Sequence, residues 1–98
     1  MTTFSRTQKF INRNIEKVPE NKAIVYKVKN AAGTTLYVGI AGRNRAQDRL
    51  FEHKELKREI IPSGTRFQFV QVKNKDRAKQ IEKQIIKEEQ PKFNEQNK

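Results

Sequence analysis

Apolar residues recur along the chain with two different spacings, which together predict three strands and three helices. Residues 23–29 and 34–40 are rich in β-branched and aromatic side chains, and the Asn-Ala-Ala-Gly segment between them is typical of a turn. We expect these two segments to pair as a β-hairpin. A third strand is predicted over residues 66–72, where phenylalanine and valine occupy most positions.

The remaining segments have the apolar spacing of amphipathic helices. Residues 4–17 carry four apolar side chains among arginine, lysine and asparagine, and this predicted helix ends before Pro19. Longer helices are expected over about residues 45–60 and residues 75–89, each followed by a proline. The predicted order is α-β-β-α-β-α, an α+β fold with a small three-stranded sheet flanked by helices.

The length of 98 residues suits one small domain. We expect its core over residues 23–94, an N-terminal helical extension over 1–20 and a frayed tail over 95–98. No stretch approaches the ~18 apolar residues that a membrane helix needs. The chain has no cysteine, which excludes disulfides, a thiolate nucleophile and Cys-ligated metal centres. An intracellular, cytoplasmic protein is expected.

The net charge of the chain indicates which class of partner it binds. Twenty-two Lys and Arg stand against eleven Asp and Glu, which gives a net charge of +11 and a pI near 10.2. Such a domain attracts polyanions in a salt-sensitive way, so we expect nucleic acid as the partner. A membrane surface is not expected, because no basic helix carries a wide apolar face. The alternative is that the charge only aids solubility.

Two polar residues fall on the apolar face of the helix predicted over residues 45–60. Arg49 and His53 lie one turn apart on the face that Ala46 and Leu50 mark as buried. A buried arginine needs an anionic partner. For His53 the alternative is a core histidine whose hydrogen bonds are satisfied, and the functional interpretation rests on Arg49 lying beside it.

The last predicted helix also has a charged residue on its apolar face, and this one is acidic. Glu82 projects within the face marked by Ala78, Ile81 and Ile85. An inward carboxylate needs a cation, a metal or a proton. The alternative to a functional carboxylate is a structural ion pair between Glu82 and Arg49.

The predicted hairpin carries the two tyrosines of the chain. Tyr26 and Tyr37 are eleven residues apart, which places them opposite each other on one sheet face if the turn has an even number of residues. A bulge at Gly33 would instead shift this register by one. Gly39 follows Tyr37 by two residues, and glycine within a strand often marks the close approach of a ligand or another backbone.

These residues resemble the motifs of the GIY-YIG nuclease superfamily. Residues 24–26 (Ile-Val-Tyr) and residues 37–39 (Tyr-Val-Gly) are similar to its paired tripeptides. Ile24 stands where the first motif has glycine, a change expected to affect loop geometry more than chemistry.

The resemblance continues through the later helices to about residue 94. Arg49 and His53 have the family's Arg-x-x-x-His spacing, and Glu82 is similar to its metal-binding glutamate. Pro91 and Asn94 resemble its closing Pro-x-x-Asn element. Six elements in the family's order make the resemblance specific, although each tripeptide alone is weak.

The resemblance implies a three-stranded mixed sheet, one divalent cation (Mg²⁺ or Mn²⁺) and hydrolysis of phosphodiester bonds in nucleic acid. Tyr26 would take a proton from water, His53 would relay it, and Tyr37 would orient water or substrate. A phenol with a pKa of ~10 needs a neighbouring base or cation to act at neutral pH. Which tyrosine is the base stays open.

The other family residues would handle charge. Arg49 would grip the scissile phosphate, because its guanidinium presents a fixed fork of donors. Glu82 would hold the cation. Gly39 and Asn94 would support the site.

Two interpretations share the basic surface: a metal-dependent endonuclease, acting on DNA rather than RNA, and a catalytically inactive DNA- or RNA-binding protein on the same scaffold. Glu82 favours the nuclease, because a carboxylate repels phosphate unless a metal intervenes. A small structural or ribosome-associated protein would leave the inward polar residues unexplained.

Contacts with the phosphate backbone are expected from exposed cations in the N-terminal segment and in the loop before the middle helix. Specificity would come from the N-terminal helix, the loop at residues 40–44, a homodimer partner or a separate specificity subunit. The expected backbone contacts are Arg6, Lys9, Arg13, Arg43 and Arg45.

Overall fold

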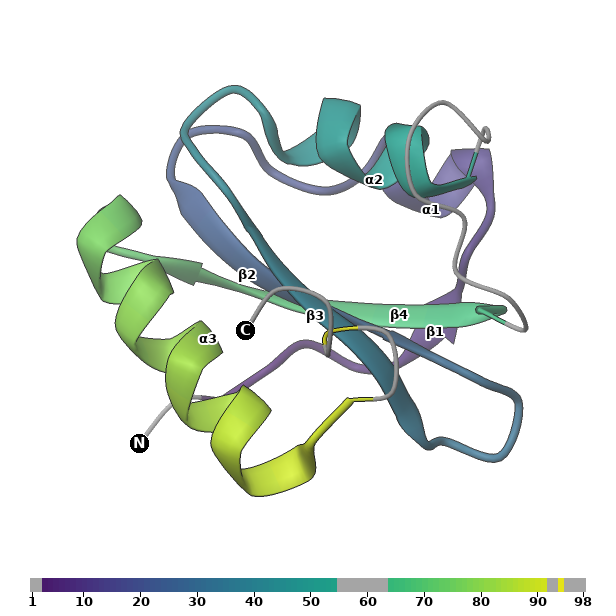
Figure 1. Ribbon diagram of the computed structural model, residues 1–98. Helices are drawn as coiled ribbons and strands as arrows, with labels where there is room; N and C mark the ends of the chain where they lie inside the picture. Colours follow the sequence, from purple (N-terminus) through teal and green to yellow (C-terminus); the bar gives the residue numbers. More distant parts are fainter. Residues whose placement is uncertain (1–2, 55–63, 92–93, 95–98) are drawn as a thin grey trace.

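The computed structural model describes residues 3–54, 64–91 and 94. Helices cover both faces of a single sheet (Figure 1). In chain order, the elements are β1 (Gln8–Lys9), α1 (Asn12–Ile15), β2 (Ala23–Lys29), β3 (Thr35–Ala41), α2 (Ala46–Lys54), β4 (Arg66–Val72) and α3 (Lys75–Glu89).

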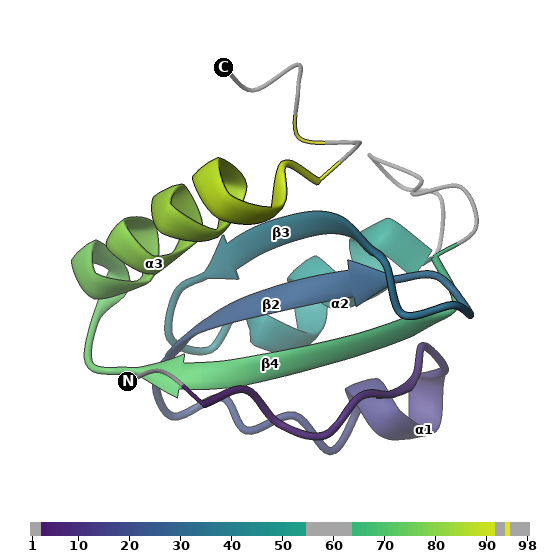
Figure 2. The same ribbon diagram turned by 90° about the horizontal axis from the view of Figure 1, so that it is seen from below.

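The sheet has the strand order β1-β4-β2-β3, and every pair of neighbours is antiparallel. The α+β class, the β2–β3 hairpin and the flanking helices are confirmed. The sheet differs from the expected one in having a fourth strand and in being antiparallel instead of mixed. The interior strands are β4 and β2, and β3 lies at one edge of the sheet (Figure 2).

The prediction of a helix over residues 4–17 is confirmed only for the short helix α1 (Asn12–Ile15) and is wrong for residues 4–10. Residues 4–10 instead run extended along β4, where the Ser5 N–H donates to the Phe69 carbonyl at 2.7 Å and the Phe10 N–H donates to the Thr65 carbonyl at 2.9 Å. Phe4 packs on one face of the sheet and Phe10 on the other. The hydrogen bonds to β4 hold residues 4–10 in an extended path, so the helical spacing of the apolar residues misled the prediction.

The two faces of the sheet bury separate clusters. Alternate residues of β2 project to opposite faces: Tyr26 and Val28 pack with residues of α1 and α2, whereas Val25 packs with Ile81 and other residues of α3. Figure 1 shows α1 and α2 on one side of the sheet and α3 on the other. Tyrosines and α3 therefore belong to different layers.

Side-chain hydrogen bonds mark where the two long helices begin, and a left-handed residue marks where α3 ends. The Glu20 carboxylate accepts the Gln47 backbone N–H at 3.1 Å in the first turn of α2, and Asn74 accepts the Arg77 N–H at 2.9 Å as the N-cap of α3. At its other end, α3 stops at Gln90, whose φ of 47° is left-handed. The bounds predicted for α3 are confirmed, while the predicted end of α2 and the tail at 95–98 lie outside the described residues. Of the helices described, none has the length and apolar character to cross a bilayer.

Asn94 covers part of the outer edge of β3. Its side-chain Oδ1 accepts the Val38 N–H at 2.9 Å, and its Nδ2 donates to the Val38 carbonyl at 3.0 Å. The amide thus pairs with β3 as a neighbouring strand would, and only 2% of Asn94 is exposed. Val38 lies between Tyr37 and Gly39, so this contact steadies the part of β3 that carries them.

Replacing Asn94 with alanine is expected to destabilise the protein by about 1–3 kcal/mol, because two buried backbone groups of Val38 lose their partner. Asn94→Asp keeps the acceptor for the Val38 N–H but sets a buried carboxylate oxygen against the Val38 carbonyl, so this variant should also be less stable than the wild type at neutral pH. Urea denaturation measures both. An Asn94→Ala variant as stable as the wild type would contradict this role.

Candidate active site

Tyr26, Tyr37 and His53 form a cluster between the sheet and α2. The Tyr26 hydroxyl lies 2.7 Å from His53 Nε2, within hydrogen-bond distance, and the Tyr37 ring centroid lies 4.9 Å from that of His53. Tyr26 is fully buried, His53 is 3% exposed and Tyr37 is 6% exposed. A phenol and an imidazole in such contact can pass a proton between them.

The strand register places both tyrosines on one face, although not directly opposite each other. Tyr26 pairs with Gly39, and Tyr37 pairs with Val28. A register shift between Val28 and Lys29 produces this pairing, so the bulge lies two strand positions from Tyr26 and not at Gly33. The tyrosines are diagonal neighbours, with ring centroids 6.3 Å apart.

Gly39 is required by the two rings. A Cβ atom at this position would lie 2.5 Å from the Tyr26 hydroxyl oxygen, 2.6 Å from its Cζ and 2.9 Å from Tyr37 Cε2. Real Cβ atoms do not approach other atoms so closely. The strand glycine marks close approach, as expected, but the approaching groups are aromatic side chains.

Arg49 lies one turn before His53 on α2, and its anionic partner is Glu52. Arg49 Nη1 is 3.0 Å from Glu52 Oε1. Burial lowers the pKa of Arg49, but Tyr26, Tyr37 and Glu52 raise it more, and the net shift is upward. The guanidinium is therefore firmly charged. Because Arg49 interacts with both phenols, it belongs electrostatically to the tyrosine cluster.

Glu82 belongs to α3, which packs on the face of the sheet opposite to the tyrosines. Burial of this half-buried side chain raises the pKa of its carboxyl, and attraction by Arg49 and Lys79 offsets only part of that rise. Among the described residues, the ion pairs of Arg49 do not include Glu82. The structural Glu82–Arg49 ion pair considered from the sequence is therefore not formed, and the two groups interact at longer range.

A pocket of about 360 Å³ connects the two layers at the end of β3. Arg45, just before α2, and Arg49 of α2 line one side, and Lys75 and Lys79 of α3 line the other. The helices can meet here because β3 is an edge strand and nothing in the sheet separates them beyond it. The other residues that line the pocket are Ile40, Ala41 and Gly42.

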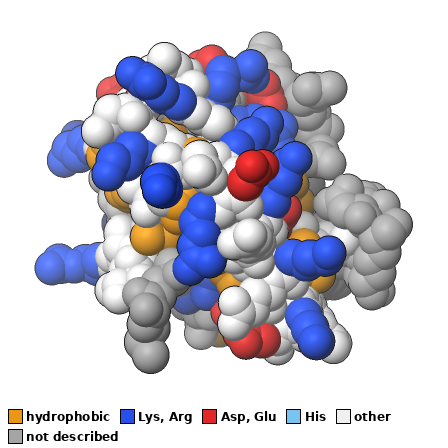
Figure 3. Space-filling model, turned by 90° about the vertical axis from the view of Figure 1, so that its left-hand side faces the viewer, with side chains coloured by type: hydrophobic (Ala, Val, Ile, Leu, Met, Phe, Trp, Pro, Cys, Tyr) orange, Lys and Arg blue, Asp and Glu red, His pale blue; other side chains and the backbone are white. Residues whose placement is uncertain are grey.

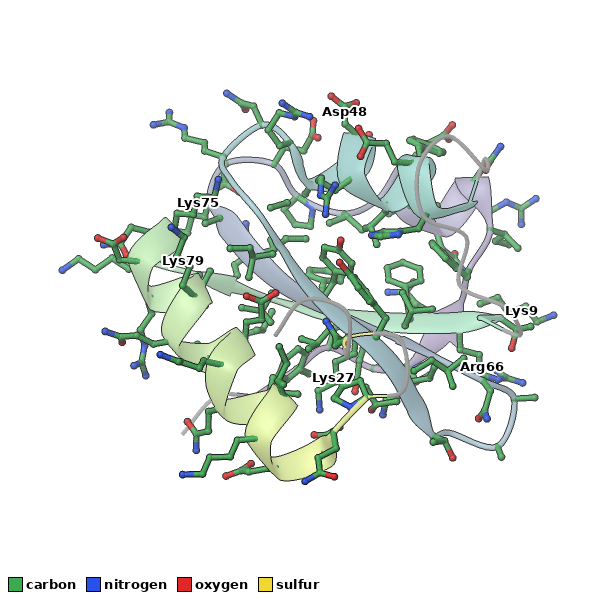
Figure 4. All side chains as sticks on the ribbon, viewed as in Figure 1. Lys9, Lys27, Asp48, Arg66, Lys75 and Lys79 are labelled. Atoms are coloured by element: carbon green, nitrogen blue, oxygen red, sulfur yellow. The ribbon has the colours of Figure 1, made fainter. Side chains whose placement is uncertain are left out.

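The cations expected to contact nucleic acid fall into two groups. Arg45 lines the pocket and Arg43 lies in the adjoining loop. Arg6, Lys9 and Arg13 belong to the N-terminal segment near β1 and α1, and Figure 4 shows Lys9 on the side of the molecule opposite to Lys75 and Lys79. All five side chains are exposed.

Three charged residues of the site were not predicted. Glu52 follows Arg49 by three residues, a spacing that favours a helical ion pair, so the signal was present. Lys75 and Lys79 come to the pocket only through the packing of α3 against the sheet, which the sequence pattern does not reveal.

The arrangement of acidic residues in the described part of the chain suits a cation that takes few protein ligands. Among the described residues, no three His, Asp or Glu side chains are grouped as a metal site. Mg²⁺ commonly binds one or two carboxylates and keeps several waters, with substrate phosphate completing its shell. A single half-buried carboxylate such as Glu82, one turn along α3 from the pocket residue Lys79, fits this type of site.

The sequence and the fold of this chain both match those of known proteins. Residues 22–95 match the family model of the UvrC-like GIY-YIG domain. The magnesium-bound N-terminal endonuclease domain of UvrC from Thermotoga maritima is 28% identical, with a TM-score of 0.71 over 84% of this chain and 92% of that chain. An asparagine-to-alanine point mutant of that domain, bound to its catalytic divalent cation, is 27% identical, with a TM-score of 0.70 over 83% and 90% of the two chains. A search of curated proteins found no match.

Gly39→Ala is expected to lower the free energy of unfolding by about 1–3 kcal/mol, because the new methyl group must displace the Tyr26 and Tyr37 rings. Gly42→Ala is the matched control, since the nearest atom to its Cβ is Lys75 Cδ at 4.0 Å. Urea denaturation measures stability, and near-ultraviolet circular dichroism reports the packing of the tyrosines. Equal effects of the two substitutions would contradict the contact.

Proposed function

Because the chain belongs to the UvrC-like GIY-YIG domain family, we propose that it is a divalent-metal-dependent endonuclease that hydrolyses phosphodiester bonds in DNA. The observation that carries the proposal is the buried contact of 2.7 Å between the Tyr26 hydroxyl and His53 Nε2. A core that needed only packing would not require this pair beside a charged arginine. The related domain of known structure is described as an endonuclease with a catalytic divalent cation.

Tyr26 and His53 act as a proton relay in the proposed reaction. The oxygen of a water molecule forms a bond to phosphorus, and the bond from phosphorus to one ester oxygen breaks. The water proton passes to the Tyr26 oxygen as the phenol proton passes to His53 Nε2, and the departing oxygen is protonated from solvent. This arrangement lets a phenol accept a proton without bearing a full negative charge in the buried cluster.

Access to the relay depends on Tyr37. Because Tyr26 has no exposed surface, water reaches its hydroxyl only after a neighbouring side chain moves. Tyr37 packs against both Tyr26 and His53 and keeps a small exposed area. We assign the base role to Tyr26, which contacts His53 directly, and the orientation of water or substrate to Tyr37.

Arg49 grips the scissile phosphate, and Glu52 holds the guanidinium in place. A guanidinium keeps several N–H donors in one plane, so the contact between Nη1 and Glu52 leaves others for phosphate oxygens. These donors stabilise negative charge that grows on the phosphoryl oxygens during the displacement.

Glu82 is the residue proposed to hold the cation, Mg²⁺ or Mn²⁺. A cation bound there would neutralise negative charge on the phosphate. In the related domain, tyrosine-to-phenylalanine and asparagine-to-alanine point mutants are described as bound to the cation. Tyrosine hydroxyls and an asparagine are thus individually dispensable for the cation in that protein, which supports a carboxylate as the ligand here.

A catalytically inactive nucleic-acid binder is the second candidate, since its basic surface would be the same. Glu82 argues against it, because an inward carboxylate beside a phosphate site weakens binding without a cation. The absence of cysteine and a nucleic-acid substrate both suit a cytoplasmic enzyme. Sequence preference would come from the loop at residues 40–44, from a second copy or from another subunit.

Nicking of supercoiled plasmid DNA tests the proposal. We expect cleavage with Mg²⁺ or Mn²⁺, none with EDTA, and loss of cleavage in Glu82→Gln. Tyr26→Phe should lower the rate by about 10²–10⁴-fold because the relay is broken, and Tyr37→Phe should lower it less. Glu88→Gln, an exposed change on the same helix, is the matched control and should keep full activity. Metal-dependent cleavage that persists in Glu82→Gln would refute the assigned ligand.

The raised pKa of Glu82 predicts a stability cost that depends on pH. The folded protein binds a proton at Glu82 more tightly than the unfolded chain does, so stability falls as pH rises from the ordinary value of 4.5 through the raised pKa. Glu82→Gln removes this fall. The variant should therefore be more stable than the wild type at neutral pH, by a margin that shrinks in acid. Thermal melts across pH measure the difference, and a less stable variant at neutral pH would contradict the cause assigned to the shift.

A further inference from the structure

Helix α3 carries a row of lysines at every fourth position. The lysine row consists of Lys75, Lys79, Lys83 and Lys87, and all four side chains are exposed. Four residues of α-helix advance by about 6 Å and turn by about 40°, so the row extends over about 18 Å and turns by about 120° around the exposed part of the helix. Figure 3 views the molecule from the side where α3 lies in Figure 1, and Lys and Arg side chains dominate that face.

The positive charge of the row is not neutralised by ion pairs. Among the residues that the structure describes, no ion pair includes any of the four lysines. Two acidic residues of α3 are engaged elsewhere: Glu89 pairs with Lys27 at 2.8 Å, and Glu88 accepts Gln84 at 3.1 Å. Asp76, in the first turn, is the acidic neighbour at the start of the row.

The row begins at the candidate active site. Lys75 and Lys79 line the same pocket as Arg45 and Arg49, and Glu82 lies within the following turn of the same helix. From this pocket the row continues along α3 through Lys83 and Lys87, away from α2. A polyanion held by Arg49 could therefore follow the lysines without leaving a positive surface.

We infer that the lysine row is a track for the phosphate backbone that flanks the scissile phosphate. The inference rests on the proposed function. Nucleic acid fits the row because its phosphates repeat along a line, as the lysines do. An anionic membrane fits poorly, since a membrane-surface helix presents an apolar face, whereas Ala78, Ile81 and Ile85 of α3 are buried against the sheet.

The N-terminal cations provide a matched comparison. Arg6, Lys9 and Arg13 carry the same charge as three lysines of the row and are equally exposed, but they belong to the N-terminal segment, and Figure 4 shows Lys9 on the side of the molecule opposite to Lys75 and Lys79. If net charge alone attracts nucleic acid, the lysine row and the N-terminal cations contribute equally to the affinity for DNA. If the row is a track for the phosphate backbone, it contributes far more to this affinity than the N-terminal cations do.

Binding of a fluorescent DNA duplex, followed by anisotropy in EDTA over a series of KCl concentrations, tests the track without requiring cleavage. Replacing Lys75, Lys79 and Lys83 together with glutamine should reduce the slope of log K against log[salt] by about 2–3, since each phosphate contact contributes about 0.9. The control replaces Arg6, Lys9 and Arg13 with glutamine. The sequence alone predicts these residues as backbone contacts, but if the row holds the backbone, this control should change the slope by less than about 1. Circular dichroism checks that both variants fold.

Equal changes of slope in the two triple variants, or an unchanged slope in the row variant, would overturn the inference. Preferential loss of binding to anionic phospholipid vesicles, with DNA binding retained, would assign the row to a membrane and also overturn it. The nicking assay separates the two proposals. A wild type that binds through the row but does not cut refutes the nuclease alone, whereas cutting with unchanged salt dependence in the row variant refutes the track alone.

Discussion

The Tyr26 ring lies directly over Gly39 of the neighbouring strand, and this contact underlies the arrangement of the whole site. It is possible only because position 39 has no Cβ and because the register shift at Val28 pairs Tyr26 with Gly39. The Tyr26 hydroxyl then meets His53 of α2 at 2.7 Å. One missing side chain and one irregularity in the strand pairing therefore bring a phenol, a second phenol and an imidazole together in a buried layer.

The edge position of β3 explains how residues from both layers can line one pocket. Helices on opposite faces of a sheet are normally separated by its thickness of strands and side chains, but beyond an edge strand they face a common space. The pocket lined by Arg49 and Lys79 is such a space. Arg49 interacts with both tyrosines and with Glu82, so it links the two layers. Asn94 keeps the same edge in order by bonding both backbone groups of Val38.

Elements with strong local patterns were predictable from the sequence, including the bounds of β2, β4 and α3. The inward orientation of Glu82 and of Arg49 also followed from helical spacing. The N-terminal segment was not predictable in this way, because Phe4 and Phe10 pack on opposite faces of a sheet that its residues alone do not define. The bulge at Val28 arises from strand pairing, and the meeting of α2 with α3 arises from tertiary packing. Helical spacing shows that Glu82 points inward but not which face of the sheet it meets.

The central claim is that a cation held by Glu82 lies close to the tyrosine pair across the edge of β3. Because the chain contains two tyrosines, protein labelled with ¹³C in the tyrosine rings gives an NMR spectrum in which each can be followed during a titration with paramagnetic Mn²⁺. We predict that both ring signals broaden in the wild type and remain sharp in Glu82→Gln at the same Mn²⁺ concentration. Ring signals that stay sharp in the wild type while amide signals near Glu82 broaden would contradict the claim, since the cation would then be bound away from the tyrosines.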